Sequence, residues 1–306
     1  MASTLHVVLY HPARLPVQGY GGTERVVVWL ARGLAELGAR VTLLAAPRSD
    51  VPEATLVPVP PTNSKTQGRL DLTPYIPADA DILHAHIPLH RAPTSVPVLW
   101  TLHGNAAPGE VLPPGAVGLS ADHARRHGLA RWAHNGLDPA EYRFAQVKGA
   151  ADLFLGRLHS VKGWQWAVAS AQRTGRRLIV AGGWRPTLQR GIRFVGEVKS
   201  ERKALLLASA ACLWNPVQWD EPFGLTSIEA MVSGTPVLGT RRGALPEIVT
   251  PDVGALGDTL DELVALRPTL DALEPEKIRA RVLEHFTHRA MAARYLAIYG
   301  EMIGRG

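Results

Sequence analysis

The chain has 306 residues, of which 46% are hydrophobic and 20% are charged. This length allows two ordinary domains of about 150 residues each, and this balance excludes the disordered and fibrous classes. The single cysteine, Cys212 in the apolar run AACLW, excludes an internal disulfide and a multi-cysteine zinc site. The apolar neighbours of Cys212 predict that its thiol is buried, and a single cysteine fits a reducing compartment.

The net charge of +6 is spread along the chain. Residues 1–140 hold 11 Arg and Lys against 10 Asp and Glu, and the rest hold 22 against 17. The densest basic segment, residues 124–131, is typical of a solvated helix face, so we expect no nucleic-acid partner. The N-terminal residues lack a signal-peptide pattern, and no run approaches the ~20 apolar residues of a membrane span. We expect a cytoplasmic protein and leave weak peripheral membrane contact open.

The first half of the chain alternates apolar strands with a helix. A strand at 5–10 and a helix at 23–38 are expected first, with Thr23 as the N-cap and Gly38 as the left-handed stop of the helix. Five further strands are expected at residues 40–46, 81–86, 96–104, 116–120 and 130–134. Their apolar, β-branched character predicts a parallel sheet that is covered on both faces.

A second alternating series follows. Its strands are expected at residues 152–158, 176–183, 192–198, 211–217 and 235–240, and its helices at 164–175, 200–210, after Gly224 and near 244–249. Two such series predict an α/β protein with two doubly wound parallel-sheet domains, at residues 1–140 and 141–285. The closing segment, residues 286–306, is helical and is expected to pack across both domains.

The segment EPFGLTSIEA places Glu221 and Glu229 on either side of a turn that is broken by Pro222 and Gly224. Amides in the first turn of a helix attract anions such as phosphate, and a glycine lets a ligand approach the backbone. Alternatively, Thr226 and Glu229 fit the capping-box pattern, so Glu229 could simply serve the start of the helix. Glu221 lies outside the helix, where this structural role does not apply.

Polar residues also follow other strands. In FLGRLHSVKGW, Arg157 and Lys162 stand at a strand end, where open α/β sheets bind ligands. Their side chains suit phosphate oxygens, although such residues are more often solvent-facing. Gly21 and Gly22 join a strand to a helix without the G-x-G-x-x-G spacing of dehydrogenases. His103 ends a strand where it can reach a ligand, although a lone histidine is usually structural.

Two motifs superficially suggest a metal site, Asp79-x-Asp81 and His84-x-His86. The aspartates precede a strand rather than follow one, and residues two apart share a strand face without a third identifiable ligand. We therefore expect no metal. The sequence also contains no Walker motif and no nucleophile elbow.

The chain contains, in this order, GGTER, TLHG, HNGLD, FLGRLHSVKG, FVGEV and WDEPFGLTSIEAMVSGTPVLGTRRGALPEIV. This ordered set resembles the family-4 retaining glycosyltransferases of the GT-B fold, the glycogen-synthase-like group. The resemblance covers nearly the whole chain, and its most specific part is the E-x7-E signature from Glu221 to Glu229. It implies two Rossmann-like domains that face a cleft, a nucleotide-sugar donor held mainly by the second domain, and a C-terminal helix that crosses back to the first.

The resemblance also implies roles for individual residues. Arg157 and Lys162 would hold the donor diphosphate, Glu221 would bond the sugar hydroxyls, and His103 would lie beside the donor sugar. These four residues form the expected catalytic set. The expected donor-binding set consists of Gly21 and Gly22 in a loop over the diphosphate, Val198 at the base, Phe223, Gly224, Leu225 and Thr226 at the sugar and phosphate, and Glu229 at the ribose.

Members of this family are thought to keep the anomeric configuration by a front-face displacement, so Glu221 is not assigned as a glycosidase-type nucleophile. The resemblance predicts a metal-independent retaining hexosyltransferase without a cofactor, using a UDP-sugar in preference to a GDP-sugar. The chain is short for the family between residues 54 and 134, so a cell-envelope glycan, a lipid and a small molecule all stay open as the hydroxyl acceptor. A non-catalytic nucleotide-sugar-binding subunit and a GT-B epimerase are the alternatives.

Overall fold

The computed structural model describes residues 4–17, 19, 21–60, 62 and 68–304. The chain divides into two compact units, residues 1–137 with 287–306, and residues 138–286. The division lies three residues before the expected boundary at 140 and one residue after the expected boundary at 285. Within the described ranges, no helix is long and apolar enough to cross a membrane.

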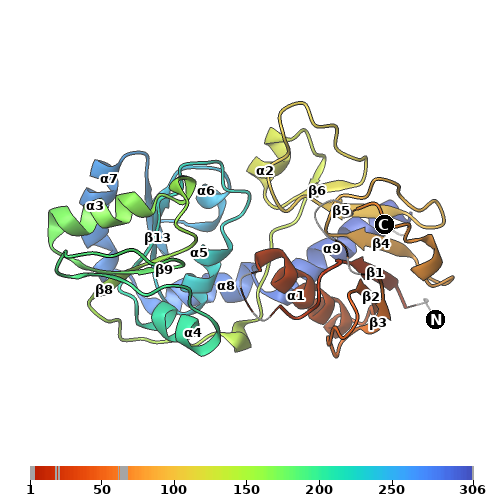
Figure 1. Ribbon diagram of the computed structural model, residues 1–306, viewed down its shortest axis with the longest axis horizontal. Helices are drawn as coiled ribbons and strands as arrows, with labels where there is room; N and C mark the ends of the chain where they lie inside the picture. The colour runs from red at the N-terminus through yellow and green to blue at the C-terminus, as the bar shows by residue number, and fades with distance from the viewer. Residues whose placement is uncertain (1–3, 18, 20, 61, 63–67, 305–306) are drawn as a thin grey trace. The chain divides into compact units, whose positions relative to one another are not determined.

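The described part of the first unit forms a seven-stranded parallel sheet (Figure 1). Its strands are, in spatial order, β3 (Thr55–Pro58), β2 (Arg40–Ala45), β1 (His6–Tyr10), β4 (Ile82–Ala85), β5 (Val98–Thr101), β6 (Ala116–Gly118) and β7 (Arg131–Trp132). All pairings are parallel, as predicted. The order reverses between β1 and β4, which makes this a doubly wound, Rossmann-like sheet. The short strand β3 was not predicted.

Helices α1 (Gly22–Glu36) and α9 (His288–Met302) pack against each other in this unit (Figure 1). The N-cap of α1 is Gly21 and has no side-chain cap, so the predicted cap at Thr23 is wrong. The helix begins one residue before Thr23, which places that residue in the first turn. The predicted left-handed stop at Gly38 is confirmed by a φ of 87°. A short helix, α2 (Ala121–Arg126), follows β6.

Loops cover the face of the first sheet that carries Val8 and Tyr10. These residues pack with Leu72 and Ile87 in one core cluster. Between β3 and β6, the described residues outside the strands form one 3-10 helix, at Thr73–Tyr75, and otherwise loops. This is the region in which the sequence is expected to be short for the family that it resembles.

The second unit repeats the strand order of the first. In its described residues, six parallel strands are ordered β10 (Ile192–Phe194), β9 (Arg177–Ala181), β8 (Ala151–Leu155), β11 (Leu213–Asn215), β12 (Val237–Thr240) and β13 (Gly254–Gly257). The order reverses between β8 and β11, where doubly wound sheets bind ligands beyond the carboxyl ends of the strands. Strand β13 was not predicted.

Helices cover both faces of this second sheet. Helices α3 (Trp164–Thr174) and α7 (Leu260–Leu266) pack together on one face, and α4 (Ser200–Ser209) and α5 (Leu225–Val232) pack on the other (Figure 1). Helix α8 (Pro275–His285) packs against α5. A four-residue helix, α6 (Leu245–Ile248), follows β12. Cys212 is fully buried as predicted, and burial raises the pKa of its thiol. Helix α7 was not predicted.

Candidate active site

Loops at the carboxyl ends of β8, β11 and β12 meet around Glu221. The backbone N–H of Gln218, after β11, donates to the carbonyl oxygen of Val161, after β8, at 2.7 Å. The N–H of Ala244, after β12, donates to the carbonyl oxygen of Glu221 at 2.9 Å. Because β8, β11 and β12 are neighbours in the sheet, their loops leave the same edge. Two predicted motifs, far apart in sequence, are therefore joined by backbone hydrogen bonds.

The side chains of Lys162 and Glu221 form an ion pair in this place. Nζ of Lys162 donates to Oε2 of Glu221 at 2.7 Å, and the indole N–H of Trp219 donates to the same oxygen at 2.8 Å. The ammonium also lies 4.7 Å from the centre of the Trp219 ring, within the range of a cation–π interaction. The Lys162 side chain is 27% exposed and the Glu221 side chain 13%, so both remain reachable from solvent. No described residue donates to Oε1 of Glu221.

Helix α5 starts at a glycine without a side-chain cap. Gly224 has a φ of 95°, the left-handed region that glycine tolerates, and helix α5 begins at Leu225. The first amides of the helix, including those of Leu225 and Thr226, have no partner inside the helix and suit an anion. Phe223 is 2% exposed and its ring packs edge-on against that of Phe286, so its side chain is closed to a ligand.

Glu229 lies on α5 and is 2% exposed. Its Oε1 accepts hydrogen bonds from the Tyr142 hydroxyl at 2.7 Å and from Nζ of Lys203 at 2.5 Å. The capping-box interpretation is wrong, because Gly224 is the N-cap and Thr226 already lies inside the first turn. Glu229 instead fastens α5 to α4 and to the segment that precedes β8.

Two other predicted residues of this unit occupy separate loops. Arg157 follows β8 in the same loop as Lys162, and its side chain is exposed. Val198 is half-buried in the turn between β10 and α4. The structure therefore brings Lys162 and Glu221 into contact, places Arg157 in the loop of Lys162, and leaves the predicted contact of Val198 with a base as a prediction.

The predicted residues of the first unit lie at the carboxyl end of its own sheet. Gly21 is the N-cap of α1 and Gly22 its first residue, while His103 follows β5. His103 is not a lone histidine: its Nε2 hydrogen-bonds Nδ1 of His86, which follows β4, at 2.9 Å. The ring of His86 stacks on that of His84, with 4.1 Å between ring centroids.

Burial keeps these imidazoles neutral. It lowers the pKa of His103 to about 3, helped by the nearby His11 and His123, and it lowers the pKa of His123 to about 4. Burial also lowers the pKa values of His84 and His86 well below that of an ordinary histidine. At neutral pH, each ring therefore has one N–H donor and one acceptor nitrogen.

The two aspartates of the suspected metal motif fasten the edge where β1 and β2 begin. Asp79 pairs with Arg40, and Asp81 accepts a hydrogen bond from the backbone N–H of His6 at 2.8 Å. Among the residues that the structure describes, no group of three or more His, Cys, Asp or Glu side chains is arranged to hold a metal ion.

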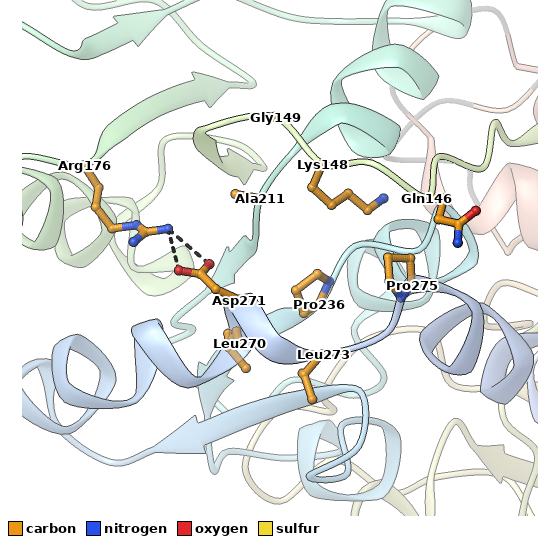
Figure 2. A pocket seen from close by; sticks show the side chains of 10 residues that line it. All are labelled: Gln146, Lys148, Gly149, Arg176, Ala211, Pro236, Leu270, Asp271, Leu273 and Pro275. Carbon is orange, nitrogen blue, oxygen red and sulfur yellow. Dashed lines mark hydrogen bonds and ion pairs between the residues drawn. The ribbon is translucent and has the colours of Figure 1, made fainter.

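A cavity of about 470 Å³ lies at the opposite edge of the second sheet (Figure 2). Lining residues such as Gly149, Ala211 and Pro236 precede β8, β11 and β12, so the cavity is at the amino ends of these strands. On its wall, Nζ of Lys148 donates to the carbonyl oxygens of Ala208 and Ser233, and burial lowers the pKa of this lysine to about 8. None of the predicted site residues lines this cavity.

Comparison with known proteins identifies the family. Residues 20–146 match the model for Glycosyltransferase Family 4, and residues 152–266 match the model for Glycosyl transferases group 1. The crystal structure of AviGT4, a glycosyltransferase involved in avilamycin A biosynthesis, is similar with a TM-score of 0.81 and 30% identity over 99% of each chain. The chain belongs to glycosyltransferase family 4. Its two doubly wound units form the GT-B fold that the sequence predicted.

Mannosyltransferases are among the curated relatives of this family-4 chain. It is 25% identical to the phosphatidyl-myo-inositol mannosyltransferase of Mycolicibacterium smegmatis, over 94% of the chain and 92% of that protein. It is 37% identical to the GDP-mannose-dependent alpha-(1-6)-phosphatidylinositol dimannoside mannosyltransferase of Mycobacterium tuberculosis, over 41% of the chain. This second match spans only 36% of the relative's length.

Several residues of this candidate site do not follow from the sequence. Tyr142 and Lys203 hold Glu229 from distant segments, and neither belongs to a recognisable motif. Trp219 lies inside the stretch that carries the signature, yet nothing in the spacing shows that its indole bonds Glu221. The sequence suggests His86 only as a metal ligand, and its spacing predicts no more than a shared strand face with His84.

Proposed function

We propose that this protein is a retaining hexosyltransferase, which moves a hexose from a nucleotide-diphosphate sugar to a hydroxyl group of an acceptor. The observation that carries the proposal is the pair of Lys162 and Glu221 beside the start of α5. A cation, a carboxylate and open helix amides at this edge of a doubly wound sheet suit a ligand that has both a diphosphate and hydroxyl groups.

The chemistry of the transfer explains this combination. Cleavage of the bond between sugar and phosphate leaves negative charge on the departing diphosphate and positive charge at the anomeric carbon. Lys162, Arg157 and the amides at Phe223, Gly224 and Leu225 would stabilise the diphosphate. The leaving phosphate would help to take the proton of the acceptor hydroxyl, on the same face of the sugar.

Glu221 suits recognition better than attack on the sugar. Its Oε2 already accepts from Lys162 and Trp219, while Oε1 can accept hydrogen bonds from the hydroxyl groups of the sugar. In the proposed arrangement, the other family positions keep their predicted roles: Glu229 for the ribose, Val198 for the base, Thr226 at the phosphate, His103 beside the sugar, and Gly21 and Gly22 over the diphosphate.

Lys162 must change partners when the donor binds. Without a ligand, the carboxylate of Glu221 neutralises its ammonium. A diphosphate would compete with this carboxylate for the ammonium, and Glu221 would then turn to the sugar hydroxyls. Glu221 would therefore weaken the binding of a bare nucleotide diphosphate and favour the complete sugar donor.

The identity of the donor follows from the resemblance and the relatives rather than from a contact. A UDP-sugar is the first expectation, and the name of the Mycobacterium tuberculosis relative makes GDP-mannose the second. The acceptor would be a hydroxyl of a glycan, a lipid or a small molecule. Because a lysine and amides can neutralise the diphosphate, we propose that transfer needs neither a metal ion nor a cofactor.

A thermal-shift screen over UDP- and GDP-sugars tests the proposal first, because a ligand that binds only the folded state raises its unfolding midpoint. The donor that raises the midpoint is then incubated with candidate acceptors, with and without EDTA, and the product anomer is determined by NMR. Transfer with retention in both conditions is expected. Donor binding with no turnover would instead favour a non-catalytic subunit, and conversion of the donor sugar without an acceptor would favour an epimerase.

A further inference from the structure

Two other histidines hold His103, one through its ring and one through the backbone of the next residue. Its Nε2 hydrogen-bonds Nδ1 of His86 at 2.9 Å, and the following residue, Gly104, accepts a hydrogen bond through its carbonyl oxygen from Nε2 of His123 at 3.1 Å. The proton of His123 is on Nε2, because its Nδ1 accepts from the backbone N–H of Leu119 at 3.1 Å. Both the ring of His103 and the backbone beside it are therefore fixed.

The bond between His86 and His103 has two forms that differ in the position of the protons. In the first, Nδ1–H of His86 donates to Nε2 of His103, and the remaining proton of His103 is on Nδ1. In the second, Nε2–H of His103 donates to Nδ1 of His86, and the proton of His86 is on its own Nε2. Burial keeps both imidazoles neutral. A pair of neutral rings can adopt either form.

The burial of His86 distinguishes the two forms. His86 is 3% exposed, and its Nε2 is buried without a hydrogen-bond partner among the described residues. The second form would place an N–H donor at this atom, whereas the first leaves only a lone pair there. A buried N–H without a partner is rarer in proteins than an unused acceptor, so the first form is favoured.

We propose that His86 is a positioning residue that keeps His103 in its Nδ1–H tautomer, so that His103 meets its ligand as a hydrogen-bond donor. No described residue hydrogen-bonds Nδ1 of His103, which leaves this N–H for a hydroxyl or phosphate oxygen. His103 cannot then serve as the base for the acceptor hydroxyl, because Nδ1 carries a proton and the lone pair of Nε2 is engaged by His86. The identity of the ligand as a sugar donor rests on the proposed function.

Nuclear magnetic resonance of the imidazole nitrogens tests this tautomer without any substrate. In ¹⁵N-histidine-labelled protein near neutral pH, long-range ¹H–¹⁵N correlations distinguish a protonated from a bare ring nitrogen. The His103 signals are identified by their loss in His103→Gln. We expect a protonated Nδ1 and a bare Nε2, and the opposite pattern in the unsubstituted protein would overturn the proposal.

Substitution of His86 tests the positioning. His86→Phe keeps a ring of similar size and removes the hydrogen bond, so the His103 spectrum should change to the Nε2–H form or to a mixture. We expect kcat to fall about tenfold, the factor that corresponds to one hydrogen bond, with KM nearly unchanged. A His86→Phe protein that folds and keeps the Nδ1–H pattern would contradict a positioning role.

Tyr299→Phe is the matched control. It removes the hydroxyl that bonds Nδ1 of His84 at 2.7 Å, in the same buried network but away from His103. It should lower the thermal midpoint and leave the His103 tautomer unchanged. If the spectra match expectation but no donor is turned over, the proposed function fails and the tautomer assignment stands. If a donor is turned over but His103 has the opposite tautomer, the proposed function stands and the tautomer assignment fails.

Discussion

A Cβ atom on Gly163 would lie 1.8 Å from the carbonyl oxygen of Pro216. Gly163 also has a φ of 71°, a left-handed conformation that side chains disfavour. The loop after β8 can approach the loop after β11 only because this residue has no side chain. Lys162 immediately precedes Gly163, and Glu221 follows Pro216 in the second loop, so this backbone approach underlies their ion pair.

Gly163→Ala should therefore disrupt the site as well as the fold. The left-handed conformation costs about 1–2 kcal/mol for a residue with a Cβ, and the collision with Pro216 adds to that. We expect a lower free energy of unfolding in urea and weaker binding of the nucleotide diphosphate, measured by calorimetry.

Gly175→Ala is the control for this substitution. Gly175 has a φ of 69°, but a Cβ there would meet no atom within 4 Å. Gly175→Ala should lower the free energy of unfolding by the cost of the left-handed conformation alone and leave nucleotide binding unchanged. Equal effects of the two substitutions on binding would show that the approach of the two loops is not what positions Lys162.

Lys162→Ala should weaken binding of the nucleotide diphosphate about 10- to 100-fold, the range expected for loss of a hydrogen bond to a charged group. Calorimetric titration with UDP and GDP measures this effect. Lys277→Ala, which removes an exposed lysine paired with Glu274 on α8, is the matched control and should bind as the unsubstituted protein does. Unchanged affinity in Lys162→Ala would remove this lysine from the proposed diphosphate site.

Glu221→Gln should separate the binding of the nucleotide from transfer of the sugar. The amide no longer competes with the diphosphate for Lys162, so the free nucleotide diphosphate should bind at least as tightly as before. Transfer should fall, because recognition of the sugar hydroxyls weakens. Kd for the nucleotide and kcat for the sugar donor measure the two effects. Loss of both nucleotide affinity and kcat would contradict the proposal that Lys162 exchanges Glu221 for the diphosphate.

The elements of the fold were predictable where the sequence has a local signal. Most strands are short apolar runs, but β13 has the sequence GALG, which contains no β-branched residue. Helix α7 does have a local signal, the T-x-x-E pattern of a capping box, in which Thr259 accepts a hydrogen bond from the N–H of Glu262. The same pattern at Thr226 and Glu229 was only apparent, because Gly224 starts that helix earlier.

The site was predictable to the extent that it lies at strand ends. Lys162 and Glu221 each follow a strand, and parallel strands bring their carboxyl ends to one edge. The partners of Glu229 could not be predicted, because Tyr142 and Lys203 are 87 and 26 residues away along the chain and are brought to it only by tertiary packing. The pairing of His86 with His103 likewise depends on the order of β4 and β5 in the sheet.

Glu229→Gln should lower both stability and nucleotide affinity. Removal of one charge from a buried ion pair typically costs about 3–5 kcal/mol, and Lys203 is 12% exposed at its side chain. Tyr142→Phe separates the two effects, because it removes one hydrogen bond to Glu229 and keeps its charge. That variant should lose about 1 kcal/mol of stability and bind the nucleotide nearly normally. If Glu229→Gln also bound the nucleotide normally, Glu229 would be a structural residue only.

The buried histidines of the first unit should make the protein sensitive to acid. The pKa of His123 is lowered from 6.5 to about 4, so the unfolded chain binds this proton at a higher pH than the folded protein does. The contribution of His123 to the free energy of unfolding is complete above pH 6.5 and is lost as the pH falls towards 4. The slope is about 1.4 kcal/mol per pH unit for each such proton. His84, His86 and His103 act in the same direction.

His123→Gln should make this pH dependence less steep by about one proton, because it removes one titrating group. The measurement is urea unfolding at a series of pH values between neutral and acid, followed by tryptophan fluorescence. Gly175→Ala, which removes no titrating group, is the control and should keep the slope of the unsubstituted protein. Parallel pH profiles for His123→Gln and the unsubstituted protein would show that His123 takes up its proton equally well in the folded and unfolded states.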